Sequence, residues 1–553
     1  MTTRVTANEV LIVGAGPTGL ALATQLREFG VPFRIVDRLE DRSRESRALG
    51  VQARTLELLQ TLRLGEPLVA RGSASTRLVM HVGARPVAEV SLGDIGATDT
   101  RFPFILFVSQ AETEALLAEH LRARGVSIER GVELVDSEPH ADHVRCTIMH
   151  SDSREEIVRA TYVVGCDGAH STVRRMGGIP FGGGTYPQSF VLGDVEAEGP
   201  LTPGAINTFV GAGAAIFFPL GRPTTWRVIA MSTDGGKLAD EDTTDRAALS
   251  LAELQEIVDV PTIASVRVRD PAWITRFHLN HRQTARYRAG RMFLAGDAAH
   301  IHSPVGAQGM NTGIQDAWNL GWKLALVVRG AADPALLGTY EAERWPVGHF
   351  LLRYTDRAFG IFTSAMSSSA LAEWARRAVI PAILPPVLGS TRVRANAFRF
   401  ISELGIRYRR SPAVTEGEPR LRRGPRAGDR LPDARITVDG RTVWLQEAIA
   451  GPRLVLLLCG DGDVDAWDAN TLAEIRERYG DVLAVHNLVA RESPGALVDE
   501  GGSVLEMLGV NGAGAAQYLV RPDGYIAFRC AGRGLRALEG YIRQWFAPRE
   551  LQM

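Results

Sequence analysis

The chain has 553 residues, of which 45% are hydrophobic, and a formal net charge of −1. This length predicts two to four domains, and the balanced charge gives no electrostatic reason to expect nucleic acid or an anionic membrane surface as a partner. Four scattered cysteines without a Cys-x-x-Cys pair fit a reducing compartment and predict neither a metal site nor a disulfide scaffold. Because we find no secretory leader and no run of the ~18 apolar residues that a membrane helix needs, we expect a soluble, cytoplasmic protein.

A glycine motif directly follows the first apolar run. Residues 10–13 predict a buried strand, and Gly14-Ala15-Gly16-Pro17-Thr18-Gly19 opens a helical pattern that stops at Gly30. A second apolar strand ends at Asp37, roughly 20 residues beyond the motif, where the ribose of a bound dinucleotide would lie. Gly14 permits a tight turn, Gly16 lets backbone N–H groups approach a pyrophosphate, and Gly19 allows close helix–strand packing. These features together predict a dinucleotide-binding βαβ unit.

An arginine cluster follows Asp37 and includes Arg38, Arg44 and Arg47. Such a cluster is usually a solvated surface, but here it lies within reach of the predicted phosphate site, so Arg47 is equally a candidate cofactor contact. A helix is predicted from about residue 55 to 64, strands alternate from about 76 to 107, and Ser109 with Glu112 predicts a capped helix.

Two further strands end in short polar motifs. Residues 161–165 predict a buried strand that leads into Asp167-Gly168, and residues 291–295 predict another that leads into Gly296-Asp297. Between them, strand-like runs at 190–195, 206–210, 215–219 and 226–231 predict an inserted antiparallel sheet. A loop at 303–312 precedes a helix expected from about Gly313 to Arg329, and helices continue to about Leu404.

The C-terminal part reads as a separate α/β unit that follows a basic, Pro/Gly-containing stretch at 407–430. Strands are predicted at 454–458 and 482–485, with a helix between them that includes residues 471–478. The run from Tyr518 to Phe528 predicts a hairpin around a Pro-Asp-Gly turn, and an amphipathic helix is predicted to end near Phe546.

The three motifs at Gly14–Gly19, Asp167-Gly168 and Gly296-Asp297 resemble, in order, those of single-component FAD-dependent aromatic hydroxylases of the para-hydroxybenzoate hydroxylase class. The whole chain is similar to the subgroup with a thioredoxin-like C-terminal domain, which includes phenol hydroxylase and polyketide-tailoring hydroxylases. The resemblance implies an α/β fold built from a Rossmann-type FAD-binding domain (1–75, 109–182 and 281–360), an inserted, mostly antiparallel β-sheet substrate domain (76–108 and 183–280), a helical linker (361–426) and a thioredoxin-like domain without Cys-x-x-Cys (427–553).

The resemblance also assigns cofactor contacts. It implies that FAD is bound by Gly14, Gly16, Pro17, Thr18, Gly19, Asp37, Arg38, Arg47, Gln110, Asp167, Gly168, Gly296, Asp297, Pro304, Gly309, Met310 and Asn311. Residues 304–312, including Gly306, would lie against the isoalloxazine ring, and the helix after Asn311 would direct free N–H groups at its anionic edge. The alternative is that Gly306 and Gly309 are ordinary loop glycines.

The family's chemistry implies that NADPH or NADH reduces FAD, that the reduced flavin reacts with O2, and that a C4a-hydroperoxyflavin transfers one oxygen to an aromatic ring. Because the flavin carries the difficult step, no catalytic side chain is required, and the sequence identifies no base. His300 and His302 are interpreted as structural, and residues 49–51 are the expected gate for a mobile flavin. Aromatic residues at 217, 218 and 226 are either a substrate wall or simple core.

The sequence therefore predicts a monooxygenase that hydroxylates a phenolic or polycyclic, polyketide-like aromatic compound in antibiotic biosynthesis. The alternatives are a Baeyer–Villiger or epoxidising enzyme on the same scaffold, and a non-catalytic flavin protein that sequesters a reactive intermediate. A halogenase is disfavoured because no Trp-x-Trp-x-Ile-Pro segment occurs, and a redox role for the C-terminal domain is disfavoured by its Cys459-Gly460-Asp461-Gly462 segment. Packing or a homodimer contact is the expected role of that domain.

Overall fold

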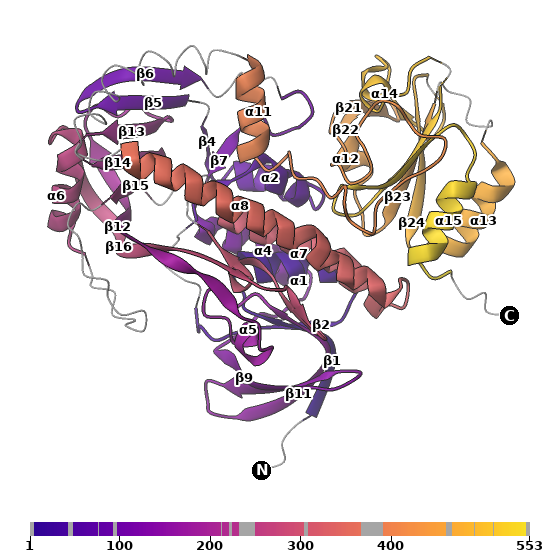
Figure 1. The fold of residues 1–553 in the computed structure, drawn as a ribbon, viewed down its shortest axis with the longest axis horizontal. Helices are drawn as coiled ribbons and strands as arrows, with labels where there is room; N and C mark the ends of the chain where they lie inside the picture. The colour runs from indigo at the N-terminus through magenta and orange to yellow at the C-terminus, as the bar shows by residue number, and fades with distance from the viewer. Residues whose placement is uncertain are drawn as a thin grey trace.

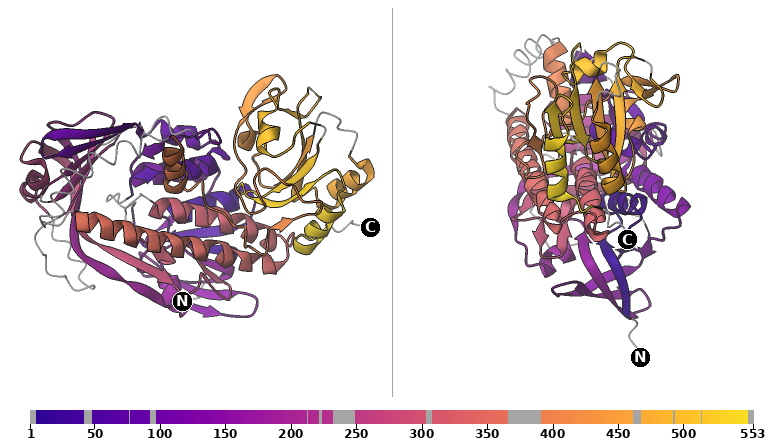
Figure 2. Two further views of the ribbon diagram at one scale, coloured as in Figure 1. Left: turned by 45° about the horizontal axis from the view of Figure 1, so that its top comes forward. Right: turned by 90° about the vertical axis from the view of Figure 1, so that its right-hand side faces the viewer.

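A computed structural model describes residues 5–41, 48–75, 77–91, 97–211, 213–220, 224–231, 249–302, 308–365, 391–460, 467–491, 493–512 and 514–548. The chain forms a first α/β domain with a large inserted sheet and a separate C-terminal domain. The inserted sheet and the C-terminal domain lie at opposite ends of the molecule, and the long helix α8 (Gly338–Ala365) runs between them (Figures 1 and 2).

The first domain is built on a mixed sheet with a parallel centre around β1, the strand before the glycine motif. The strand order is β17 (Arg288–Ala289), β18 (Met292–Leu294), β11 (Glu155–Gly165), β1 (Val5–Val13), β2 (Phe33–Asp37) and β8 (Glu129–Arg130). In addition, β10 (Val144–His150) pairs with β11, and β9 (Val132–Pro139) pairs with β10, both antiparallel. Strand β1 pairs in parallel with both β11 and β2, and β11 pairs in parallel with β18. The three strands that precede the three motifs therefore end at the same edge of one sheet.

Helices cover this sheet and hold its motif edge in place. They are α1 (Pro17–Glu28), α2 (Ala53–Gln60), α3 (Gly65–Val69), α4 (Gln110–Ala123), α5 (Thr172–Met176), α7 (Gly309–Val328) and the short helices η1 (Gly296–Ala298) and η2 (Pro334–Leu337). Helices α1 and α7 approach closely because glycine faces the partner: a Cβ on Gly313 would collide with Thr18 Oγ1, and one on Gly321 would lie 2.8 Å from Gln25 Cβ. The first turn of α7 begins at Gly309, four residues before the predicted start, so the prediction that Gly309 and Asn311 belong to a loop was wrong.

The inserted sheet is mostly antiparallel. Its order is β19 (His300–Ile301), β16 (Arg267–Thr284), β12 (Phe181–Glu198), β15 (Trp226–Met231), β14 (Ala214–Pro219), β13 (Ile206–Val210), β5 (Arg77–Val82) and β6 (Arg85–Ser91). Strands β13 and β5 pair in parallel, and α6 (Leu251–Thr262) packs on the sheet. Residues 105–107 do not join this sheet: β7 (Ile105–Phe107) pairs with β3 (Gly50–Val51) and β4 (Ser73–Ser75).

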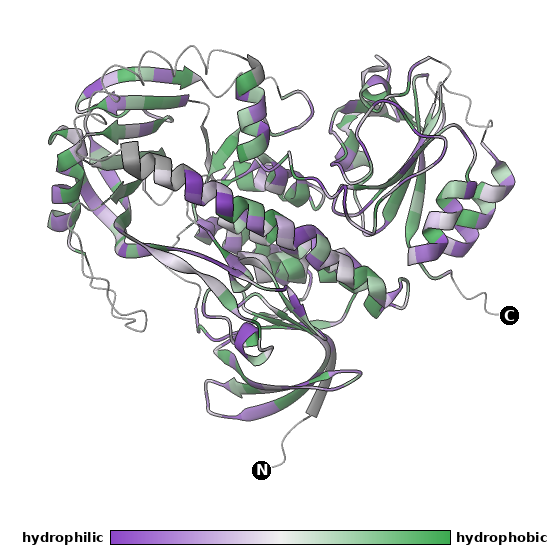
Figure 3. Cartoon of the chain, in the orientation of Figure 1, coloured by the Kyte–Doolittle hydropathy of each residue, from purple (hydrophilic) through white to green (hydrophobic). Residues whose placement is uncertain are grey.

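The C-terminal domain contains its own mixed sheet. The order is β20 (Thr415–Glu416), β27 (Ile526–Ala531), β26 (Ala516–Val520), β23 (Leu454–Gly460), β24 (Leu483–Val489), β25 (Leu497–Val498), β21 (Arg435–Val438) and β22 (Arg441–Trp444). Helices α12 (Leu445–Ala448), α13 (Ala469–Tyr479), α14 (Ser503–Met507) and α15 (Arg536–Trp545) accompany it, while α11 (Thr391–Ile401) precedes it. The central strands are hydrophobic and the outward faces of α13 and α15 are polar (Figure 3). The predicted hairpin is present as β26 and β27, whereas a thioredoxin-like fold stays a prediction.

Buried ion pairs join the C-terminal domain to the first domain. Arg430 donates to Glu57 of α2 at 3.0 Å and to Asp99 at 2.7 Å. Arg54 of α2 is 1% exposed and donates to the backbone carbonyl of Asp523 in the hairpin turn. Charged groups with so little exposure require partners, so the residues on the two sides of this interface depend on one another.

Candidate functional site

A cavity of about 670 Å³ lies where the first domain, the inserted sheet and α11 meet. Its wall on the first-domain side includes Gly16, Pro17, Thr18, Gln110, Gly168, Asp297, Gly309 and Met310, and its wall on the sheet side includes Leu78, Val90, Ile206, Phe218 and Ile229. Candidate site residues from distant parts of the sequence therefore line one cavity.

The glycines of the first motif have different physical roles. Gly14 has φ +101°, and a Cβ there would collide with the carbonyl oxygen of Cys166, while a Cβ on Gly19 would collide with the carbonyl oxygen of Gly14. These two glycines are required by close backbone packing. Gly16, in contrast, lines the cavity and has no atom within 4 Å of an added Cβ. The open space beside Gly16 adjoins the N-terminus of α1, which no side chain caps.

Asp37 at the end of β2 positions the glycine loop. One carboxylate oxygen accepts a hydrogen bond from Ala15 N at 2.7 Å, and the other accepts one from Leu39 N at 2.9 Å. Arg130 approaches the same carboxylate at 3.5 Å. Arg38 is exposed, and Arg47 lies outside the described residues. Asp37 therefore holds the glycine loop in place, and its contact with a ribose stays a prediction.

The second motif lies on the opposite side of the glycine loop. Gly168, with φ +75°, and Cys166 line the cavity. Asp167 accepts hydrogen bonds from the backbone N–H groups of Thr172 and Val173 at 2.6 and 3.2 Å, so its side chain fixes the start of α5. Burial raises the pKa of the Asp167 carboxyl.

The third motif and Gln110 face the cavity from neighbouring positions. Asp297 in η1 is exposed toward it, and Gly296 has φ +63° and donates its N–H to Asp316 at 3.0 Å. Gln110 accepts a hydrogen bond from Ala48 N at 3.3 Å and donates to Glu114 at 2.8 Å. Hydrogen bonds therefore hold the Gln110 side chain at the cavity wall, and Asp297 lies on the same wall.

The N-terminus of α7 forms another part of the wall through Gln308, Gly309 and Met310. Asn311 does not line the cavity: its buried side chain donates to Gly50 O and accepts from Gln52 N, both at 2.8 Å. Its amide satisfies the backbone on both sides of Val51, so the side chain acts as a clamp for β3, and its contact with the ring stays a prediction. Pro304 and Gly306 lie outside the described residues.

The candidate aromatic wall divides into two groups. Phe218 lines the cavity and packs on Phe107 with ring centroids 5.4 Å apart. Phe217 and Trp226 are buried in the core of the inserted sheet, where their rings are 6.4 Å apart. One of the three aromatic side chains thus faces the space, and the other two stabilise the sheet behind it.

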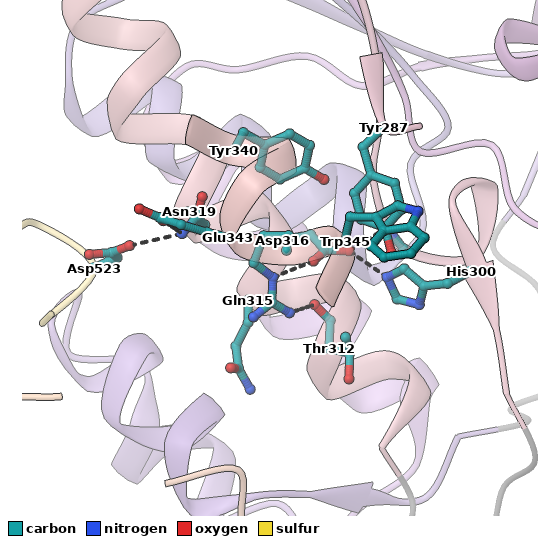
Figure 4. Close-up of polar contacts among 12 residues, drawn as sticks. Tyr287, His300, Thr312, Gln315, Asp316, Asn319, Tyr340, Glu343, Trp345 and Asp523 are labelled. Carbon is teal, nitrogen blue, oxygen red and sulfur yellow. Dashed lines mark hydrogen bonds and ion pairs between the residues drawn. The ribbon is translucent and has the colours of Figure 1, made fainter. Parts of the chain in front are cut away.

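His300 and His302 belong to a buried polar chain beside the cavity. His300 Nε2 lies 2.7 Å from Asp316 Oδ2, and His300 Nδ1 lies 3.0 Å from His302 Nε2. Arg344 of α8 donates to the other Asp316 oxygen at 2.6 Å, and Figure 4 shows His300 directed at Asp316 on α7. Burial and the charge of His300 lower the pKa of His302 to about 3.

Two family models match almost the whole chain. A family described as FAD binding domain matches residues 7–355, and a family described as aromatic-ring hydroxylase, C-terminal, matches residues 424–548. The chain is also 35% identical over 540 residues to 6-methylpretetramide 4-monooxygenase of Streptomyces rimosus, covering 97% of this chain and 93% of that protein. The chain belongs to the FAD-dependent aromatic hydroxylases.

Solved structures of other FAD-dependent aromatic hydroxylases have the same architecture. OxyS anhydrotetracycline hydroxylase from Streptomyces rimosus superposes with a TM-score of 0.73 at 31% identity, covering 98% of this chain and all of that one. The flavin-dependent monooxygenase PieE, solved with FAD and substrate, gives a TM-score of 0.79 at 26% identity over 97% and 99% of the two chains. The family, the mixed α/β fold with an FAD-binding domain, the enzyme class and FAD as the cofactor are confirmed.

The cavity also contains residues that the sequence analysis missed. Helix α11 contributes Arg394, Ala397, Phe398 and Ile401. The sequence indicated that this segment is helical but not where it packs, because that position depends on the distant domains on either side. In the described ranges, every helix is too short or too polar to cross a bilayer, and no cluster of three or more His, Cys, Asp or Glu side chains could hold a metal.

Proposed function

We propose that this hydroxylase consumes NAD(P)H and O2 to hydroxylate a phenolic or polycyclic, polyketide-like aromatic compound. The observation that carries the proposal is the single cavity shared by the three FAD motifs and an apolar wall from the inserted sheet. A shared space places an aromatic ring and the redox-active part of the cofactor within reach of one another.

The residues present fit FAD. The open space beside Gly16, at the uncapped N-terminus of α1, suits a pyrophosphate because backbone N–H groups and the helix dipole favour negative charge there. Gln110 and Asp297 would hold the ribityl chain. Gly309 and Met310 would lie beside the ring, where the N-terminus of the 20-residue helix α7 stabilises negative charge. When bound, FAD supplies hydride acceptance and O2 activation.

The protein's own contribution is orientation and exclusion of water. The side chains of Leu78, Val90 and Ile229 make the substrate end of the cavity apolar, and Phe218 offers a ring face for stacking. Arg394 is a cationic group on the α11 side that can bind a phenolic or enolic oxygen. A flat aromatic compound with a few oxygen substituents matches these walls best.

The names of relatives support this substrate class. Proteins that are 34% and 30% identical over 98% and 94% of this chain are an anhydrotetracycline monooxygenase and a pentachlorophenol 4-monooxygenase. Relatives at this level of identity therefore include one enzyme named for anhydrotetracycline and one named for pentachlorophenol. The first of these is the more similar to this chain. We therefore propose a role in antibiotic tailoring for this chain. A homodimer and a thioredoxin-like C-terminal domain are further parts of the proposal.

The test is NADPH and NADH oxidation by the purified yellow protein in air, with and without phenols, naphthoquinones, anthraquinones and anhydrotetracycline. The reaction is repeated under ¹⁸O2, and products are weighed. Stimulated NAD(P)H oxidation and a hydroxylated product with one ¹⁸O atom are expected. A ring-expanded lactone as the product would indicate Baeyer–Villiger oxidation instead of hydroxylation, and an epoxide would indicate the epoxidising variant. Bound flavin without NAD(P)H oxidation would indicate a sequestering protein.

A further inference from the structure

Helix α11 presents one side to the cavity, and that side is apolar except at one position. Its cavity-lining residues are Arg394, Ala397, Phe398 and Ile401, which are spaced by three or four residues and therefore lie on one face of the helix. The wall that the inserted sheet contributes to the same cavity consists of apolar side chains. A guanidinium in such surroundings requires its own explanation, because charged groups are rare in apolar walls unless a partner or ligand needs them.

The C-terminal end of α11 is attached to the flavin side of the cavity. Ser402 O, directly after the helix, accepts a hydrogen bond from Arg54 N at the start of α2 at 3.2 Å. Glu403 is 1% exposed and accepts a hydrogen bond from Thr312 Oγ1 of α7 at 3.1 Å. Because the ring of FAD is proposed to lie beside the start of α7, Ile401 marks the flavin end of the cavity-facing side of α11.

Arg394 lies at the other end of this side. It precedes Ile401 by about two helical turns, which corresponds to about 10 Å along the helix axis. Figure 1 shows α11 extending away from α2, so Arg394 is remote from the attachment to α7. On the opposite side of α11, Arg399 donates to Asp99 at 2.9 Å and helps to fix the orientation of the helix. A ligand that contacts both ends of α11 must therefore span about 10 Å.

The charges in the cavity wall favour one orientation of an anionic ligand. Burial lowers the pKa of His302 to about 3 and raises the pKa of the Cys166 thiol, so neither side chain is charged near neutral pH. Among the described residues of the wall, Asp297 on the side of the FAD motifs and Arg394 on α11 remain as charged groups. An anionic group is attracted by Arg394 and repelled by Asp297, so it points away from the flavin side.

We infer that Arg394 selects a fused polycyclic substrate that carries an acidic oxygen group, a carboxylate or an ionised enol, at the end remote from the reacting ring. This inference rests on the proposed hydroxylation and names the substrate class within it. A guanidinium is a planar fork with five N–H donors. It can therefore bind two oxygens of such a group even when a neighbouring residue accepts from another donor. The fused rings extend past Phe398 to Ile401, whereas a single ring contacts only one end of α11.

The first experiment measures equilibrium binding to the oxidised, FAD-loaded enzyme by isothermal titration calorimetry. The probes are anthracene-2-carboxylate and the corresponding amide, which have the same rings and similar shapes but differ in charge. Wild type is expected to bind the carboxylate more tightly than the amide by about tenfold or more, because hydrogen bonds to charged groups contribute more than neutral ones. Arg394→Met is expected to abolish this preference and to leave the affinity for the amide nearly unchanged.

Two further variants separate recognition of the anion from general effects on α11. Arg394→Lys keeps the positive charge but loses the planar fork, so it is expected to restore part of the preference. Arg399→Met changes the opposite side of the same helix and is expected to keep the full preference. Flavin content and circular dichroism show whether each variant is folded. A carboxylate preference in folded Arg394→Met equal to that of wild type would overturn the inference.

The second experiment tests the length of the ligand. Benzoate, naphthalene-2-carboxylate and anthracene-2-carboxylate are each added to saturation, and the change in the flavin absorbance spectrum is recorded. The change is expected to increase with the number of fused rings, because only the longer ligands extend from Arg394 to the start of α7. A change with benzoate as large as that with anthracene-2-carboxylate would overturn the requirement for a polycyclic ligand.

The outcomes distinguish this inference from the proposed function, because neither experiment consumes NAD(P)H. Selective binding of the carboxylate without hydroxylation of any compound would count against the proposed function alone. Hydroxylation of neutral polycyclic compounds by an enzyme without the carboxylate preference would count against the role of Arg394 alone.

Discussion

Arg521 of the C-terminal domain and Glu343 of α8 form a two-pronged ion pair across the domain interface, with N–O distances of 2.7 and 2.8 Å and side chains 1% and 0% exposed. Lys323 of α7 donates to the same carboxylate at 2.8 Å, and Ser411 donates to it at 2.6 Å. Although burial opposes the shift, Arg521 and Lys323 lower the pKa of Glu343. The carboxylate is therefore charged and fully bonded inside the protein.

Arg521→Met should lower the stability of the whole enzyme. Removing one partner of a buried ion pair leaves the other charge poorly compensated and costs about 3–5 kcal/mol. The matched control is Arg543→Met, which removes a partly exposed pair with Glu539 in α15 and should cost about 1 kcal/mol or less. Urea unfolding followed by circular dichroism gives both values. Similar losses for the two variants would contradict the role assigned to Arg521.

Gly16→Ala should fold normally and bind little flavin. Its backbone at φ −77° suits alanine and an added methyl meets no protein atom, but the methyl would occupy the space proposed for the pyrophosphate. Gly19→Ala should impair folding, because its methyl collides with a backbone carbonyl. The flavin-to-protein absorbance ratio and the far-UV spectrum distinguish the two outcomes. A full complement of flavin in Gly16→Ala would remove this loop from the cofactor site.

Glu403→Gln should flatten the pH dependence of stability. Burial raises the pKa of Glu403 from 4.5 to about 8, so the folded protein holds this proton more tightly than the unfolded chain. The resulting stabilisation is complete below about pH 4.5 and is lost as the pH rises through 8, by up to about 1.4 kcal/mol per pH unit. Urea unfolding of both proteins from pH 5 to 8 should show wild type losing stability relative to the variant. Parallel curves would show that Glu403 titrates normally.

Asn311→Ala should loosen β3, because it removes the partners of Gly50 O and Gln52 N, and a buried group left unpaired costs about 1–3 kcal/mol. The same change should weaken flavin retention if residues 49–51 form the proposed gate. Unfolding midpoint and release of flavin fluorescence measure the two effects, with Asn470→Ala on α13 as the control. Unchanged stability would show that β3 is held by its pairing with β7 alone.

Local sequence patterns were sufficient where a strand is apolar and turns bound it. The strands at 206–210 and 226–231 were predicted with the observed bounds. The strands before the first two FAD motifs end where predicted, at Val13 and Gly165, but begin earlier than predicted, at Val5 and Glu155. The start of α7 was predicted four residues late because Gly309, Asn311 and Thr312 are typical of loops. Their helical conformation depends on tertiary contacts, chiefly the clamp between Asn311 and β3.

The parts that the sequence could not predict depend on contacts between distant segments. The spacing of His300 and His302 does not show that His300 pairs with Asp316 or that His302 lines the cavity. The place of Arg394 and Phe398 in the wall depends on how α11 returns to the first domain. The role of Gly16 could be distinguished from that of Gly14 and Gly19 only from the atoms that surround each glycine.

The ion pairs at the domain interface limit how family members can exchange parts. A hybrid enzyme that joins residues 1–430 of this chain to the C-terminal domain of another hydroxylase would keep Arg54 and Glu343. It would lose Arg521 and the carbonyl of Asp523 unless the donor has an equivalent hairpin turn. The unit that can be exchanged is therefore the C-terminal domain together with the facing surfaces of α2 and α8. Hybrid enzymes joined at the linker alone should be too unstable for their substrate preference to be compared.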